Sequence, residues 1–340
     1  MQTVLPAAPS IAAPPVSCVV LAELAADRVI SGSALARRLG VTRAAVWKQI
    51  ERLRASGVPI VAESGRGYRL SAPVDLLDPR TIAAEFARCT SARGASLGGL
   101  HVHWHIDSTN SELLRLAAQG APDRLACLAE IQIAGRGRCG RAWHLPLCGG
   151  LALSLLKRFD LSIAALAGLS VAAGLAVVRA LADVGVDSVR LKWPNDIVAG
   201  QRKLAGILIE LGGDALGPCH AVIGVGLNVR LNDTAAIDQP CIDLAALAPD
   251  GVPERNRMAA ALLRRLIDAL EIFANKGLAA FSAEYARYDA LAGKRVRVCG
   301  PGAMREGVAC GIDARGALRV EDGNGVFSVD AGTVSVRDIE

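Results

Sequence analysis

Three arginines and three glycines alternate in the segment IAGRGRCGRAW, residues 133–143. Arginine binds carboxylate and phosphate groups through paired hydrogen bonds, and glycine lets backbone N–H groups approach an anion closely. The composition therefore predicts an anion-binding loop with Arg136, Arg138 and Arg141 as its cations. A solvated loop and an arginine–glycine segment that binds RNA are the alternatives. A single short copy inside a folded region is atypical of the RNA-binding kind.

The glycines of this loop also match the spacing of a dinucleotide-binding fingerprint. Gly135, Gly137 and Gly140 read G-x-G-x-x-G, and Asp160 follows roughly where an acidic partner would stand. That fold needs a helix that begins at the last glycine. Here Trp143 and a proline-glycine stretch lead instead into LALSLL, which reads as a strand. The P-loop pattern G-x-x-x-x-G-K-[ST] is missing from the sequence as well, so neither nucleotide fold is predicted.

Further candidate residues follow in VRLKWPNDIVAGQRKLAGILIEL, which predicts strand, turn, strand, with a second bend at GQRK before ILIEL. On this reading Lys192 and Lys203 lie on neighbouring strands and reach one pocket from two sides, with Asn195 and Asp196 at the turn between them. The alternative is a core tryptophan, a turn aspartate and two solvated lysines. The strand AVIGVGLNV then brings Asn228 near its end.

Polar groups also follow the strand LHVHWHI, residues 100–106. Its three histidines alternate and therefore share one face. A metal site is conceivable, but no Asp, Glu or Cys lies within ligand spacing, so half-buried strand residues and no metal are predicted. The DSTN segment, residues 107–110, then marks a strand-to-helix junction. Its short side chains either cap the helix or face a small polar ligand.

Composition bounds the class of protein. The 340 residues are 52% hydrophobic, and 38 basic against 33 acidic groups leave a charge of +5, so a nucleic-acid contact would come from a local patch. Nine cysteines without a CxxC pair predict a reduced, intracellular chain. Apolar runs are interrupted before about 18 residues, so no membrane span is predicted. Residues 1–16 hold four prolines and no basic residue, which predicts a disordered tail rather than a secretion signal.

Residues 17–72 predict a winged helix-turn-helix domain. Ser33 is the expected cap of a short helix that ends at Gly40, and Thr42 is the expected cap of a longer basic helix. The segment VPIVAESGRGYRL predicts a hairpin, the wing. If the module binds DNA it is expected to do so as a dimer; the alternative is a solvated basic face without DNA. The candidate DNA contacts are Thr42, Arg43, Trp47, Lys48 and Arg66.

These segments together resemble the biotin protein ligase family. GRGRCGRAW, KWPND, RKLAGILIE and GVGLNV follow DSTN in that order, and with the helix-turn-helix in front the chain is similar to the ligases that also repress biotin genes. The similarity covers roughly residues 18–338. It implies an α+β protein: the DNA-binding domain, an α/β core related to class II synthetases at 80–290, and an SH3-like β-barrel at 292–340. The linker is placed at 71–80, and short alternating strands after Gly293 agree with the barrel.

The resemblance also implies roles for individual residues. Asp196 carries a further expectation, as acceptor of the proton of the incoming lysine or as a group that orients it. Catalysis is assigned to Lys203, Arg138 and Asp196. Biotin contacts are assigned to Ser108, Thr109, Asn110, Gln132, Arg136, Gly137, Arg138 and Lys203. Nucleotide contacts are assigned to Arg138, Arg141, Trp143, Lys192, Asn195 and Asn228, with Asp196 on the same side.

The implied reaction has two steps. ATP and Mg²⁺ convert biotin to biotinyl-5′-AMP with release of pyrophosphate, and the acyl group passes to a lysine of a biotin carboxyl carrier protein, such as that of acetyl-CoA carboxylase. A flexible cationic loop would cover the intermediate and exclude water. Cys139 stands where the family's repressor form has another arginine, which removes one charge from the loop. The implied repressor is a cytoplasmic homodimer on operator DNA. The rivals are a lipoate-type ligase of the same fold and a ligand-sensing transcription factor without ligase activity.

Overall fold

The computed structural model describes residues 16–25, 29–71, 74–89, 96–231, 239–248, 251–299, 304–332 and 335–338. The chain divides into two compact units, Met1–Leu76 and Leu77–Glu340, which are described separately. The predicted tail lies outside the described residues except for Val16, with which the first helix begins.

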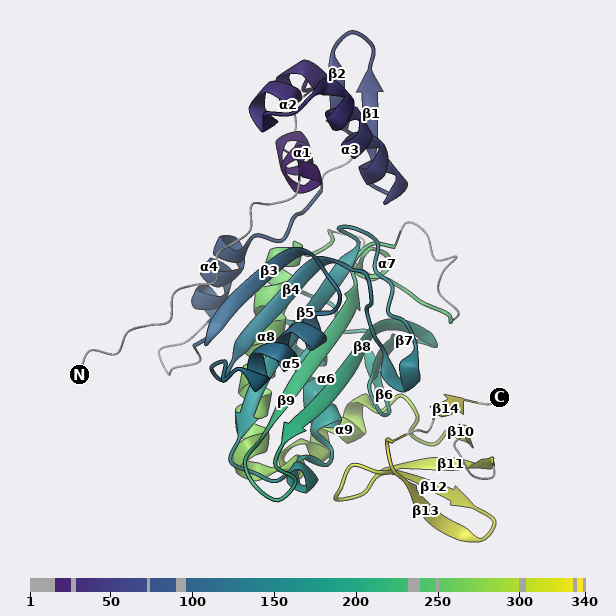
Figure 1. Cartoon of the computed structure of the whole chain (residues 1–340). Helices are drawn as coiled ribbons and strands as arrows, with labels where there is room; N and C mark the ends of the chain where they lie inside the picture. The colour runs from purple at the N-terminus through teal and green to yellow at the C-terminus, as the bar shows by residue number, and fades with distance from the viewer. Residues whose placement is uncertain are drawn as a thin grey trace, which may run out of the picture. The chain divides into compact units, whose positions relative to one another are not determined.

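The first unit is a winged helix-turn-helix, as the sequence predicts. Gly40, with φ of 63°, ends the second helix, and Thr42 caps the third by accepting a hydrogen bond from Ala45 N at 3.1 Å. The cap of the second helix is Ser31 and not Ser33, because the helix begins at Gly32 and Ser31 has the extended backbone that a cap needs. The elements of this first unit are α1 (Val16–Ala25), α2 (Gly32–Leu39), α3 (Arg43–Ala55), β1 (Ile60–Glu63) and β2 (Gly67–Leu70) (Figure 1).

The second unit is built on a seven-stranded sheet in the order β3-β4-β5-β9-β8-β7-β6 (Figure 1). β3 and β4 are parallel, and the other neighbouring strands are antiparallel. The expectation that Lys192 and Lys203 lie on neighbouring strands is wrong, because the chain turns twice and places β7 between them. The strands are β3 (Gly99–Ile106), β4 (Leu125–Gln132), β5 (Gly150–Phe159), β6 (Arg190–Lys192), β7 (Asp196–Ala199), β8 (Arg202–Gly213) and β9 (Cys219–Asn228).

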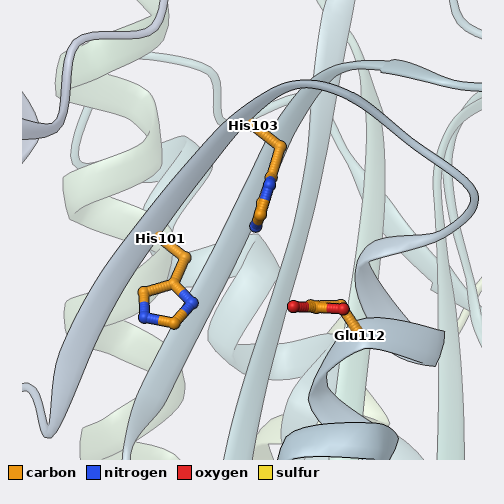
Figure 2. A group of neighbouring side chains, drawn as sticks. All are labelled: His101, His103 and Glu112. Atoms are coloured by element: carbon orange, nitrogen blue, oxygen red, sulfur yellow. The ribbon is translucent and has the colours of Figure 1, made fainter. Parts of the chain in front are cut away.

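Helices cover both faces of this sheet. α5 packs on β4, β5 and β9, and its Glu112 points toward His101 and His103 of β3 (Figure 2). α4, α6 and α8 pack together, and they contact β3, β8 and β5 respectively. The helices are α4 (Pro79–Cys89), α5 (Thr109–Ala118), α6 (Leu169–Ala182), α7 (Leu244–Leu247), α8 (Arg255–Lys276) and α9 (Ser282–Tyr288).

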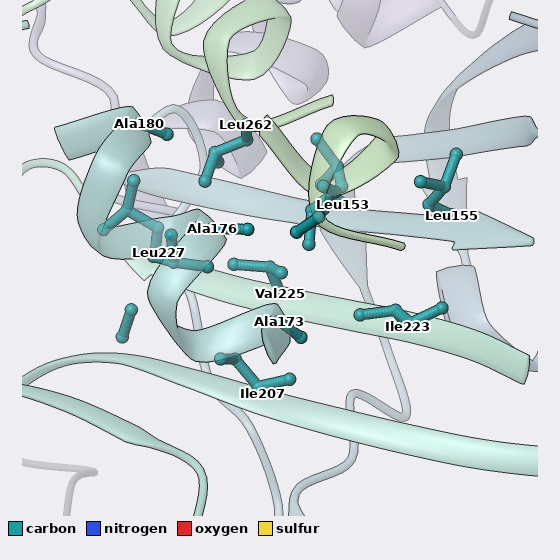
Figure 3. Packing of buried hydrophobic residues seen from close by; sticks show 14 of the residues in the cluster. Leu153, Leu155, Ala173, Ala176, Ala180, Ile207, Ile223, Val225, Leu227 and Leu262 are labelled. Atoms are coloured by element: carbon teal, nitrogen blue, oxygen red, sulfur yellow. The ribbon is translucent and has the colours of Figure 1, made fainter. Parts of the chain in front are cut away.

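The main core lies between the sheet and helices α6 and α8. Small alanines of α6 face Val225 and Ile207 of the sheet, and Leu262 of α8 closes the same cluster (Figure 3). By length and composition alone, one segment of the described chain, Ile163–Ala182, would suffice to cross a membrane. Its backbone is interrupted at Gly168, and 61% of its most apolar window is buried inside the protein, as in a core helix.

A second, smaller sheet follows in the order β13-β12-β11-β10-β14. Trp193 joins it to the larger sheet, because its ring is buried among the valines and leucines of the small sheet and its Nε1 donates to Gly316 O at 3.0 Å. Among the described residues no ladder joins β13 to β14, so closure into an SH3-like barrel stays a prediction. The strands are β10 (Arg295–Cys299), β11 (Arg305–Ile312), β12 (Leu318–Asp322), β13 (Gly325–Val329) and β14 (Ser335–Asp338).

Candidate functional site

A cavity of about 470 Å³ opens on the face of the sheet that carries α5. It is lined by the first turn of α5, the end of β4, the arginine loop, the β6–β7 turn, and residues of β8 and β9. This volume is in the range of small-molecule sites. Five cationic side chains and one carboxylate are among the described lining residues: Arg136, Arg138, Arg141, Lys192, Lys203 and Asp196. A small anionic ligand is therefore the best electrostatic match.

The first turn of α5 forms one end of the cavity. Ser108 caps the helix, and Gln132 at the end of β4 accepts from Thr109 through both the N–H (2.8 Å) and the hydroxyl (3.1 Å). Asn110 Nδ2 donates to Glu210 at 2.8 Å. Ser108, Thr109 and Asn110 are buried, and the DSTN segment thus both caps the helix and lines the cavity. These fixed amides and hydroxyls suit a neutral polar group that both donates and accepts hydrogen bonds.

Glycines make the floor of the cavity. A Cβ at Gly226 would lie within 2.6 Å of three atoms of the Trp143 ring, and a Cβ at Gly224 would lie 2.3 Å from Asn110 Oδ1. Gly206 of β8 lies opposite Gly226 of β9. A Cβ at Gly206 would lie 3.1 Å from atoms of Trp143 and Lys203, which is about as close as a Cβ contact can be. Trp143 can therefore lie flat on the strands only because these positions lack side chains.

The arginine loop covers this floor. Arg136 makes two 2.9 Å contacts with the Glu210 carboxylate, and Gly137 N donates to Arg141 O at 2.7 Å. Arg138 reaches across the cavity to Asn195 Oδ1 (3.1 Å) and to the carbonyls of Ala331 and Gly332 beside the small sheet. Burial lowers the pKa of the Arg138 guanidinium, although an arginine stays protonated in any protein. Inside the loop the backbone forms a 3₁₀ turn at Arg138–Gly140 and a β-bridge between Arg136 and Ala142, and no α-helix begins at Gly140.

Lys203 and Asp196 form the polar centre. Lys203 Nζ lies 2.7 Å from Asp196 Oδ1 and 5.3 Å from the centroid of the Trp143 ring. This contact is an ion pair, so the Asp196 charge is matched by Lys203, but its angles are not those of a hydrogen bond and Oδ1 accepts none among the described residues. The buried Trp143 Nε1 likewise has none. Both groups remain available to a ligand, and buried polar atoms normally find a partner.

The structure brings most of the predicted site residues together. All the residues predicted to be catalytic or to bind biotin line the cavity, as do Arg141, Trp143, Lys192 and Asn195. Asn228 does not: its amide donates to Ile242 O at 3.0 Å and to Lys203 O at 3.3 Å, which fixes the start of β8. Its burial among main-chain carbonyls is a structural role, and a nucleotide contact there remains a proposal.

Sequence reasoning missed two supporting side chains. Ser154 Oγ, in the middle of β5, lies 2.7 Å from Thr109 Oγ1 and 2.6 Å from Asn110 Oδ1. Glu210 of β8 binds both Asn110 and Arg136. Each is a lone polar residue in an apolar strand, LALSLL and ILIEL, and that isolation was the available signal because buried polar groups need partners.

The candidate DNA contacts occupy the surface of the first unit. Arg43, Trp47 and Lys48 are exposed on α3, and Trp47 is 58% exposed although it is a large apolar side chain. Arg66 is exposed at the wing and pairs with Glu63 at 2.9 Å. An uncovered aromatic residue between two basic ones, on a helix whose other face is buried, is typical of a binding face.

Protein-family models match three regions of the chain. A helix-turn-helix domain model matches residues 19–69. The biotin/lipoate A/B protein ligase family model matches residues 104–228, and the model of the biotin protein ligase C-terminal domain matches residues 292–337. The second and third regions contain the cavity-lining strands and the small sheet.

Whole proteins are similar too. The bifunctional ligase/repressor BirA of Escherichia coli (strain K12) is 36% identical over 94% of this chain and 97% of its own length. The biotin–[acetyl-CoA-carboxylase] ligase of Mycobacterium tuberculosis is 40% identical over 71% of this chain and 90% of its own. Among solved structures, the Aquifex aeolicus biotin protein ligase in complex with biotin and ATP aligns with a TM-score of 0.62 and 27% identity, over 71% of this chain and 99% of that one.

Proposed function

The chain belongs to the biotin/lipoate A/B protein ligase family, and from that premise we propose that its cavity joins biotin to AMP and passes the biotinyl group to a lysine of a carrier protein. One observation carries the proposal. A fixed polar end, made by the first turn of α5 and Gln132, lies in the same cavity as five cationic side chains. A ligand with a neutral polar head and an anionic tail fits both ends.

The polar end selects between the two acids that the family name allows. Biotin carries a ureido ring that donates and accepts hydrogen bonds, whereas lipoate carries a dithiolane ring that does neither strongly. Thr109, Asn110 and Gln132 present hydroxyl and amide groups that are already oriented by neighbouring bonds. A site built for hydrogen bonds rejects a ligand that leaves those groups unpaired. Biotin is therefore the proposed substrate.

The first step joins two anions. A biotin carboxylate oxygen attacks the α-phosphorus of ATP, the bond from that phosphorus to the α,β-bridging oxygen breaks, and the β- and γ-phosphates leave as pyrophosphate. Negative charge builds on the phosphate oxygens and on the leaving group, so Lys203 and Arg138 stabilise the transition state more than the separate reactants. Trp143, flat on its glycine floor, offers a ring face beside Lys203 for the adenine. The arginine loop then keeps water from the mixed anhydride.

The second step transfers the acyl group. The amine of the carrier lysine attacks the biotinyl carbonyl carbon, AMP leaves, and one proton must depart from the nitrogen. Free lysine has a pKa of about 10.4 and is an ammonium group at neutral pH, so it must first lose another proton to become the attacking amine. Asp196 is the cavity's carboxylate among the described residues, and its Oδ1 lacks a hydrogen-bond partner there. It is proposed to accept that proton or to orient the amine.

A Mg²⁺ ion fits this site as a companion of the nucleotide. Magnesium prefers oxygen ligands, and it is usually held by one or two carboxylates together with substrate phosphates. Asp196, whose buried Oδ1 accepts no hydrogen bond and pairs with Lys203 Nζ, is the residue that would hold it. When bound, the ion would neutralise charge on the triphosphate. The arginines and Lys203 supply the protein's own share of that neutralisation.

Biotin-dependent exchange of labelled pyrophosphate into ATP tests the ligase proposal. The chain is expected to catalyse exchange with biotin and only weakly with lipoate, because only the ureido ring satisfies the polar end of the cavity. Exchange with lipoate alone would identify the rival ligase. A chain that binds biotin but exchanges nothing would be a ligand sensor.

The first unit makes the protein a repressor as well as a ligase, as its bifunctional relatives are named. Thr42, Arg43, Trp47, Lys48 and Arg66 are proposed to contact operator DNA. One such module binds few base pairs, and a homodimer would present two of them to a two-fold symmetric operator. Dimerisation on adenylate binding is proposed, since a ligand can shift an equilibrium toward the state it binds better.

Gel shifts on the promoter of the biotin genes test this second role. Biotin plus ATP is expected to raise operator affinity about 5- to 150-fold, the usual range of a coupling between two sites. Lys48→Ala is expected to weaken binding to every DNA sequence alike if its contact is to phosphate. A shift that ignores biotin and ATP would contradict the coupling, and no shift at all would contradict the repressor role.

The domain limits are proposed at 17–72, 80–290 and 292–340. The division of the chain between Leu76 and Leu77, inside the expected linker 71–80, supports the first of them. The family matches at 19–69 and 292–337 support the outer two. Carrier proteins, operator DNA and ATP are cytoplasmic partners in bacteria such as those of the relatives, and the cytoplasm is the proposed location.

A further inference from the structure

His101, His103 and Glu112 form a cluster of metal-binding atoms on the α5 side of β3 (Figure 2). One ligand atom from each residue lies within 4.8 Å of the other two. The two imidazole rings have centroids 6.2 Å apart and are inclined at 75°, and the Glu112 carboxylate points toward them from the first turn of α5. The cluster thus joins an edge strand to the helix that follows it.

The sequence predicts no metal here, because neighbours along the chain offer no third ligand. His101 and His103 alternate on a strand and share a face, but no acid stands near them in the sequence. The turn after Ile106 reverses the chain, so α5 packs on the same face of the sheet and returns Glu112 to the histidines. A third ligand therefore arises from the tertiary fold.

We propose that His101, His103 and Glu112 bind a divalent transition-metal ion, with Zn²⁺ as the expected occupant. Two imidazole nitrogens and one carboxylate oxygen are a recurring zinc donor set, which leaves a fourth position for water. Zinc bonds of about 2.0–2.2 Å bring ligand atoms closer than they lie here. The necessary shift is small, because the three ligand atoms already lie within 4.8 Å of one another and all three side chains are only partly buried.

His103 gives independent support. Its Nε2 is buried and has no hydrogen-bond partner within the described chain, which is uncommon for a polar atom removed from water. Burial, together with the charge of Arg115 and the neighbouring His101, lowers the pKa of His103 against the opposing influence of Glu112.

Arg115 is the competitor for Glu112. Its guanidinium lies 2.7 Å from the Glu112 carboxylate and makes two further bonds, of 2.8 and 3.0 Å, to Asp107. When Glu112 turns to a metal ion, Arg115 keeps the Asp107 carboxylate, so no charge is left unpaired. The competition predicts that removal of Arg115 strengthens metal binding, which a merely structural histidine pair would not show.

The site is separate from the ligase cavity. None of the three residues lines that cavity, although Thr109 and Asn110 of the same helical turn do. The ion would therefore tie α5 to β3 without touching the reactants. Metal bound at 100 times its dissociation constant would favour the folded state about 100-fold and raise the midpoint of thermal unfolding.

Titration of the full-length chain, without a histidine tag, tests the proposal. Co²⁺ absorption in the visible range and Zn²⁺ calorimetry should both give one equivalent per chain. His101→Ala, His103→Ala and Glu112→Gln should each weaken that site about 10- to 100-fold or more, as disruption of a metal site typically does. Arg115→Gln should strengthen it. All four variants keep every cysteine, so thiol binding is not altered.

His105→Ala is the matched control, because this exposed histidine alternates on the same strand but stays outside the cluster. Its Co²⁺ spectrum and Zn²⁺ affinity should equal those of the unaltered chain. Equal weakening by His105→Ala and His103→Ala would show adventitious surface binding and overturn the proposal. So would one-equivalent binding that survives the His101→Ala, His103→Ala double variant. Thermal unfolding without metal establishes that each variant is folded.

Discussion

Lys203→Gln is expected to slow biotin-dependent adenylation about 10²- to 10³-fold, the usual cost of removing one group that stabilises developing charge. Glutamine keeps most of the length and hydrogen-bonding capacity of the side chain and removes only its charge. The Lys203 side chain is only 15% exposed, and its ammonium group is held 2.7 Å from Asp196 and beside the Trp143 ring. Its charge is therefore fixed at the cavity, and the variant has no other group at that position to replace it. Pyrophosphate exchange at saturating biotin and ATP measures the loss.

The matched control is Lys276→Gln. Lys276 is exposed at the end of α8, far from the residues that line the cavity, and its replacement removes the same charge from the protein. Exchange by this variant should equal that of the unaltered chain. Exchange by Lys203→Gln within a factor of about three of the control would remove Lys203 from the mechanism, because a charge-stabilising role requires about 10²-fold or more.

Asp196→Asn is expected to slow transfer from preformed biotinyl-AMP about 10²- to 10⁴-fold, which is the range for loss of a general base. Asparagine fills the same space and cannot take a proton at neutral pH. Formation of the adenylate should suffer less, since that step moves no proton to Asp196 and the asparagine carbonyl still offers an oxygen to Mg²⁺. Single-turnover transfer to a carrier domain, measured apart from pyrophosphate exchange, separates the two steps.

Asp187→Asn serves as the control for lost negative charge, because Asp187 is exposed and outside the cavity. An unchanged transfer rate in Asp196→Asn would contradict both roles.

The elements of this fold were largely predictable from local chemistry. Gly40 and Thr42 fix the turn between α2 and α3 because one permits a left-handed backbone and the other satisfies an unpaired N–H. The strands around the cavity were predictable from alternating apolar residues, and the arginine loop from its glycines. The error at Ser33 is of two residues, because serines stand on both sides of Gly32 and each is a suitable cap for a helix that begins at the next residue.

The contacts between segments far apart in the sequence could not be predicted. Lys192 and Lys203 were expected on adjacent strands, yet a second tight turn placed β7 between them. Ser154 and Glu210 support Asn110 from positions 44 and 100 residues away, and no local pattern reports such distances. Glu112 meets His101 and His103 for the same reason. The residues that line the cavity could thus be predicted from their residue types and motifs. The distant side chains that bind them could not.

Arg138 illustrates how the small sheet takes part in the site. Its guanidinium bonds to the carbonyls of Ala331 and Gly332 and to Asn195, so the loop is held across the cavity from two sides. Val336 of β14 also lines the cavity. Arginine provides several donors in one plane, and one side chain can therefore hold protein carbonyls while it also contacts a phosphate. The carboxyl-terminal region completes the site that the ligase core begins.

The central claim is that this cavity activates biotin with ATP, and pyrophosphate exchange in the presence of biotin tests it most directly. The unaltered chain should incorporate labelled pyrophosphate into ATP only when biotin is supplied, Lys276→Gln should do so equally, and Lys203→Gln should lose about 10²-fold or more of the rate. Exchange that proceeds without biotin, prefers lipoate or is indifferent to Lys203 would contradict the account.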